Sequence, residues 1–160
     1  MVVLNEGQAL CVAEEMEKRA IRMYERALML TDDPATVAGI RELLAEERSH
    51  LVRFREMKAQ HPILAAEEQL IISSMAADVL YSGGVMEMKR EQALTTLEGL
   101  YRYAAQSEAN AVETYGGFAS KCTDPKVQEA FMAIAREESR HLSALLEKLE
   151  STGKQADESC

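Results

Sequence analysis

A short motif, Glu-x-x-His, occurs twice in this chain at positions 91 residues apart: Glu47 with His50, and Glu138 with His141. The residues around the motif repeat at the same distance, so that three further features return: Glu17 and Glu108, Tyr24 and Tyr115, Asp33-Pro34 and Asp124-Pro125. A long internal repeat indicates that one supersecondary unit is present twice. The sequence therefore predicts two copies of a helical hairpin with the same carboxylates and imidazoles.

Apolar residues recur at helical spacing through four long segments that few Gly or Pro interrupt. We expect helices over about residues 5–31, 34–60, 91–121 and 125–150, with Asp33 as the N-cap and Pro34 as the first residue of the second helix. A further helix is expected over residues 67–80, ended by Gly83-Gly84. Glu17, Glu108 and both motifs fall inside the apolar stripes of their helices.

The connection over about residues 61–90 is long enough to travel back along a helical bundle. We therefore predict an all-α fold, a four-helix bundle with a long crossover between helices 2 and 3. It forms a single domain over residues 1–152, in which the hairpin repeats cover about 5–60 and 91–150. The polar residues 153–160 are expected to form a flexible tail.

Composition excludes several classes of partner and site. The net charge of -9 argues against a nucleic-acid backbone or an anionic membrane surface as the partner. No apolar run reaches about 18 residues and no leader pattern begins the chain, so we expect a cytoplasmic protein without a membrane span. The three cysteines form no Cys-x-x-Cys pair, which argues against a disulfide framework or a thiolate metal site.

The repeated motif points to metal binding. Positions i and i+3 share a helix face, so each motif directs one carboxylate oxygen and one imidazole nitrogen to a common point. Four carboxylates in an apolar core repel one another unless cations compensate them, and this oxygen-rich set with two imidazoles favours iron or manganese. The candidate ligands are Glu17, Glu47, His50, Glu108, Glu138 and His141. Glu46 and Glu137 also precede the histidines, but Glu47 and Glu138 lie nearer the inner face.

Two tyrosines accompany these ligands. Tyr24 and Tyr115 lie two turns after Glu17 and Glu108 and face the same core. Each is expected either to assist catalysis from outside the ligand set, by donating a hydrogen bond to a ligand carboxylate of the opposite hairpin, or to be an ordinary core aromatic residue.

The six candidate ligands resemble the diiron ligands of the ferritin-like superfamily, and specifically of the rubrerythrin-type domain, over nearly the whole chain. The resemblance implies a ferritin-like bundle with two iron ions per chain, or manganese or a mixed pair. It implies that Glu17 and Glu108 bind one metal each, that His50 and His141 do likewise, and that the remaining two glutamates bridge or chelate. The implied activity is reduction of hydrogen peroxide or dioxygen in defence against oxidative stress.

The sequence differs from the family in two respects. It lacks the rubredoxin domain with two Cys-x-x-Cys pairs, so electrons are expected from a separate donor such as a rubredoxin-like protein. Ala111 stands where the family tends to have an additional glutamate. The alternatives are a ferroxidase or iron-handling ferritin-like protein and a non-catalytic, metal-stabilised bundle. The long helices carry more methionine and tyrosine side chains than the core of one chain needs, which favours a homodimer.

Overall fold

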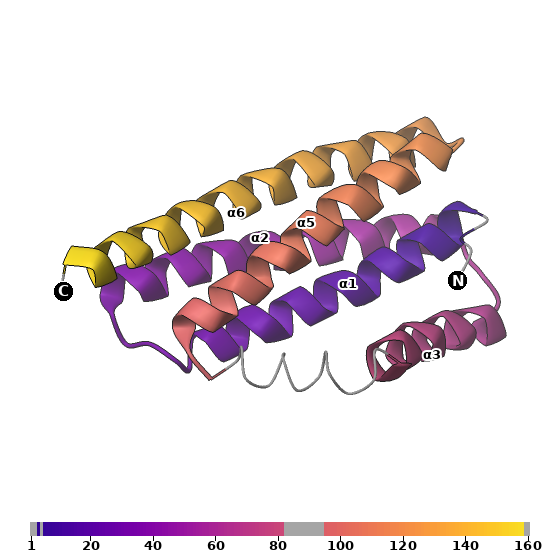
Figure 1. Ribbon diagram of the computed structural model, residues 1–160. Helices are drawn as coiled ribbons and strands as arrows, with labels where there is room; N and C mark the ends of the chain where they lie inside the picture. The colour runs from indigo at the N-terminus through magenta and orange to yellow at the C-terminus, as the bar shows by residue number, and fades with distance from the viewer. Residues whose placement is uncertain (1–2, 4, 82–94, 159–160) are drawn as a thin grey trace.

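The computed structural model describes residues 3, 5–81 and 95–158, and in this part of the chain it contains five helices and no strand. The helices are α1 (Glu6–Ala27), α2 (Pro34–Gln60), α3 (Ala65–Tyr81), α5 (Leu97–Lys121) and α6 (Pro125–Glu158) (Figure 1). The all-α prediction is confirmed. None of the described helices is long and apolar enough to cross a membrane.

Local capping chemistry sets the helix boundaries. The Asp33 carboxylate accepts a hydrogen bond from the Thr36 amide and Pro34 follows it, as predicted for the start of α2. The third long helix, by contrast, begins at Leu97 and not near residue 91. Thr96 is extended, with φ -127° and ψ 151°, and its hydroxyl accepts from the Gly99 amide as an N-cap. Residues 91–94 lie outside the described part.

Two other helix ends differ from expectation. α1 ends at Ala27, four residues before the predicted end, and a short turn leads from it to Asp33. α6 continues to Glu158, so helix extends into residues 153–160, for which we expected a flexible tail. Gly83-Gly84, expected to end the helix over residues 67–80, lies outside the described part; the helix there, α3, covers Ala65–Tyr81.

The long helices pack as two hairpins, α1 with α2 and α5 with α6, which also meet through α1 with α5 and α2 with α6. Two apolar clusters mark the ends of the bundle. One contains Tyr24, Ile40, Leu100 and Leu145, and the other contains Leu10, Phe54, Tyr115 and Phe131. The first cluster therefore joins the beginnings of α2 and α5, and the second joins their ends. These two helices run in the same direction (Figure 1), so the chain between them has to lead back along the bundle.

α3 lies outside the four long helices against the first half of α1. Ile71 and Met75 of α3 pack on Cys11 and Val12 of α1. Ion pairs fix the same corner, because the Lys58 ammonium at the end of α2 contacts both Glu14 of α1 and Glu68 of α3. α3 thus covers one side of the first hairpin.

Candidate metal site

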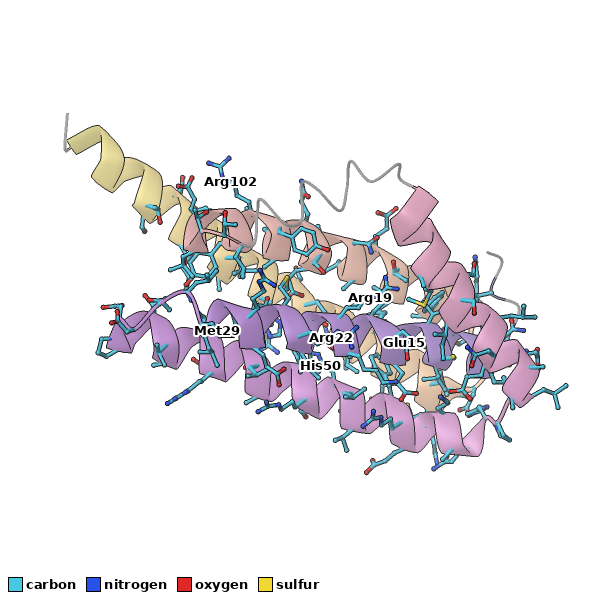
Figure 2. All side chains as sticks on the ribbon, turned by 90° about the horizontal axis from the view of Figure 1, so that it is seen from below. Glu15, Arg19, Arg22, Met29, His50 and Arg102 are labelled. Atoms are coloured by element: carbon cyan, nitrogen blue, oxygen red, sulfur yellow. The ribbon has the colours of Figure 1, made fainter. Side chains whose placement is uncertain are left out.

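All six candidate ligands lie in one layer between the two apolar clusters. α1 supplies Glu17, α2 supplies Glu47 and His50, α5 supplies Glu108, and α6 supplies Glu138 and His141. Their exposed fractions run from 0% for Glu47 to 4% for His141, although charged residues are seldom fully buried unless they are paired. His50 is labelled in Figure 2, which views the bundle from the side of α1. The sequence pattern therefore located the buried polar layer of the bundle.

The six residues form two overlapping groups of possible metal ligands. Glu17, Glu47, His50 and Glu138 make up one group, and Glu47, Glu108, Glu138 and His141 make up the other. Within each group, one ligand atom from every residue lies within 4.8 Å of the others. Two such groups could hold a pair of metal ions. Glu47 and Glu138 belong to both groups, so they would be shared between the two ions.

The two oxygens of each shared carboxylate face different histidines. The Nδ1 atom of His50 lies 3.4 Å from Glu47 Oε2 and 3.2 Å from Glu138 Oε1. The Nδ1 atom of His141 lies 3.1 Å from Glu47 Oε1 and 2.9 Å from Glu138 Oε2. Glu17 Oε2 is 3.7 Å from the first Nδ1, and Glu108 Oε1 is 3.6 Å from the second. The layer therefore has an approximate two-fold arrangement that matches the sequence repeat.

Six buried polar atoms of this layer have no hydrogen-bond partner, because the close approaches between them lack hydrogen-bond geometry. They are Glu17 Oε2, both carboxylate oxygens of Glu47, Glu138 Oε2, and Nδ1 of His50 and of His141. Buried polar groups are nearly always paired, so six in one layer require an explanation. A cation is a partner that carboxylate oxygens and a neutral imidazole nitrogen can share. The donor set fits metal ions; coordination itself stays a prediction.

Burial and mutual repulsion perturb the ionisation of these groups. Burial raises the pKa of Glu17 and of Glu108 to about 7. Burial alone would lower the pKa of His50, but the carboxylates of Glu138, Glu17 and Glu47 outweigh it and raise this pKa to about 12. The carboxylates around His141 raise its pKa in the same way. Without metal the layer holds protons, and metal ions would have to displace them.

The two tyrosines connect the hairpins, as one of the two predicted alternatives requires. The Tyr24 hydroxyl donates to Glu108 Oε1 and the Tyr115 hydroxyl donates to Glu17 Oε1, both at 2.5 Å. Burial raises the pKa of both tyrosines well above the usual value, so the phenols stay protonated and remain donors. Each tyrosine therefore holds the carboxylate of the opposite repeat, while a catalytic role for either stays a prediction.

Sequence reasoning missed the positions of Glu46 and Glu137, which it treated only as alternative ligands. Glu137 Oε2 lies 2.6 Å from Nε2 of His50, and Glu46 Oε2 lies 2.5 Å from Nε2 of His141. Each carboxylate thus contacts the imidazole of the other repeat on the side away from the buried layer. A carboxylate on one ring nitrogen orients the ring and leaves the other nitrogen free to bind a metal. The available signal was a glutamate directly before each motif.

Ala111 is buried in the apolar cluster with Phe54 and Phe131, and it adds no carboxylate to the layer. The candidate ligand set therefore stays at four glutamates and two histidines.

Comparisons with known proteins give no further identification. No protein-family model matches the chain, and searches of curated proteins and of solved structures found no match.

Proposed function

We propose that this chain is a ferritin-like, rubrerythrin-type dinuclear iron protein that reduces hydrogen peroxide or dioxygen with electrons from a separate donor. The observation that carries the proposal is the set of six buried atoms without hydrogen-bond partners, which converge from three helices, α1, α2 and α6. The parallel course of α2 and α5 also supports a ferritin-like connection.

The residues would divide between two ions in a symmetric way. Glu17 and His50 would hold one ion, Glu108 and His141 would hold the other, and Glu47 and Glu138 would serve both. Oxygen ligands with two imidazoles and no thiolate suit iron, and manganese would also be accepted. Two ferrous ions can supply the two electrons that, with two protons, convert one hydrogen peroxide molecule into two water molecules.

The chain contributes position and exclusion of solvent. Tyr24 and Tyr115 restrain the two unshared carboxylates, and Glu46 and Glu137 restrain the imidazoles. The apolar clusters on both sides keep the layer dry, which strengthens electrostatic interactions within it. These groups pre-organise the ligands, so little rearrangement is needed when metal binds.

The first test is metal content and reactivity. Protein from iron-supplemented cells should contain two iron ions per chain by elemental analysis. Its ferric absorption should disappear on anaerobic reduction and return with one equivalent of hydrogen peroxide, or with dioxygen if that is the oxidant. Glu47→Ala removes a shared ligand and should lower the iron content, whereas Glu42→Ala, on an exposed part of α2, should not.

Three results would count against the proposal. Absence of bound metal after anaerobic ferrous loading would refute the site. Unchanged iron content in Glu47→Ala would favour a bundle in which the layer is only structural. Accumulation of many iron ions per chain on aerobic ferrous loading would favour iron handling over peroxide reduction.

A further inference from the structure

Three arginines, Arg19, Arg22 and Arg26, form a row on α1 that we term the arginine stripe. The spacing i, i+3, i+7 places them on one helix face. Each residue of an α-helix is rotated by about 100° around the axis from the one before it. The three arginines therefore project within about 40° of the direction opposite to Glu17. Arg22 and Arg26 are exposed and Arg19 is half-buried. Figure 2 shows Arg19 and Arg22 along α1 on the side turned towards the viewer.

No carboxylate in the described part of the chain pairs with the arginine stripe. The neighbouring acids have other partners: Glu15 lies 2.8 Å from Lys18, and Glu25 lies 3.0 Å from Arg48. The chain as a whole carries a net charge of -9, so carboxylates outnumber basic side chains and many are available for pairing. Three uncompensated guanidinium groups in one row create a local positive potential on an otherwise acidic protein.

The sequence repeat provides an internal comparison. The positions 91 residues after the arginine stripe are Asn110, Glu113 and Gly117 on α5, and none of them is basic. The buried layer is symmetric between the repeats, so holding two ions does not require arginines on one helix only. The asymmetry therefore points to a task at the surface of α1.

We propose that the arginine stripe is the docking surface for an acidic electron-donor protein that reduces the metal site. The inference rests on the proposed function, which needs an external donor because the chain has no Cys-x-x-Cys pair. Glu17 projects from the opposite face of the same helix, so a donor on the stripe is separated from the ligand layer by about one helix diameter, roughly 10 Å. Each docked donor gives up one electron, and two encounters supply the pair that peroxide reduction consumes.

The test compares two triple variants with the same change in net charge. Arg19→Gln/Arg22→Gln/Arg26→Gln removes the stripe, and Arg41→Gln/Lys126→Gln/Arg136→Gln removes three exposed basic side chains from α2 and α6. A rubredoxin, an acidic one-electron iron protein, serves as the probe. Its binding is measured by calorimetry with metal-free and iron-loaded chains, and its rate of electron delivery is measured by stopped-flow absorption. An uncharged small reductant, photoreduced deazariboflavin, reports reduction without docking.

The stripe variant should lose at least about 10-fold in probe binding and in reduction rate at low ionic strength, and its rate should depend less on salt. The control variant should match the wild-type chain, and all three should react equally with deazariboflavin. Equal losses in both triple variants, or none in either, would overturn the docking surface while leaving the metal site intact. A change in oligomeric state of the stripe variant alone would mean that a second copy of this chain occupies the arginine stripe. That result would also overturn the proposed docking of an electron donor. Binding at the stripe without electron transfer would uphold docking and refute the proposed function.

Discussion

Glu137→Gln should weaken one of the two metal positions and leave the other nearly unchanged. The Glu137 carboxylate lies 2.6 Å from Nε2 of His50, and the buried Nδ1 of that ring faces one group of candidate ligands. Glutamine keeps the size and one acceptor oxygen but removes the charge. A hydrogen bond to a charged partner is worth about 1.5–3 kcal/mol and a neutral one about 0.5–1.5 kcal/mol. The difference, about 1–1.5 kcal/mol, corresponds to a loss of roughly 10-fold in metal affinity, within the usual range for such contacts.

The crosswise geometry makes the prediction specific. Glu46 contacts His141, so Glu46→Gln should weaken only the other position. Anaerobic titration with Co²⁺, followed by visible absorption and by competition with a chelator, should give one weakened equivalent in each single variant and two in the double variant. Glu42→Gln, exposed one turn before Glu46 on α2, should bind as the wild-type chain does. Affinities within about two-fold of wild type in both variants, or equal weakening of both positions by one substitution, would refute the reasoning.

Four further substitutions test the fold around the site. Gly117→Ala should raise the free energy of unfolding by about 1 kcal/mol in urea titrations, because nothing lies within 4 Å of the added Cβ and alanine favours helix. Gly7→Ala should instead lower it by about 1–3 kcal/mol, since its Cβ would lie 2.4 Å from the His61 carbonyl oxygen. Burial alone would raise the pKa of Glu14, but Lys58 and Arg55 outweigh it and lower this pKa to about 2. Glu14 therefore contributes stability above its ordinary pKa of 4.5 that is lost as the pH falls towards 2. The free energy of unfolding of the wild-type chain should exceed that of Glu14→Gln by about 1–2 kcal/mol at pH 7, and this difference should shrink by pH 3. Tyr115→Phe leaves Glu17 Oε1 without its donor and should destabilise the metal-free chain by about 1–3 kcal/mol in thermal unfolding.

The repeat made the buried layer predictable. An apolar stripe specifies which helix face turns inward, and a glutamate or histidine within that stripe must share the core with it. Because Glu17 and Glu108 occupy matching places in the two repeats, the same reasoning identified both from sequence. The turn at Asp33-Pro34 was also predictable, because its N-cap chemistry is local.

Features that depend on the relative rotation of two helices were not predictable in the same way. The contact from Glu46 to His141 joins α2 and α6, and no pattern within either helix records how far each is rotated towards the other. The start of α5 was misplaced for a different reason. Apolar spacing continues through the residues before Leu97, whereas the Thr96 hydroxyl competes locally and caps the helix at that point.

The two repeats face different demands inside and outside the bundle. Glu47 and Glu138 each present one oxygen to the imidazole of His50 and the other oxygen to that of His141, so a change at either residue disturbs both halves of the layer. Symmetry at the centre therefore follows from sharing. No such coupling joins the outer faces: α3 packs on α1, the arginine stripe lies on α1, and none of the three matching positions of α5 is basic. Since the layer needs none of these features, their presence on one repeat alone is consistent with the proposal that the arginine stripe of the first hairpin is a docking surface.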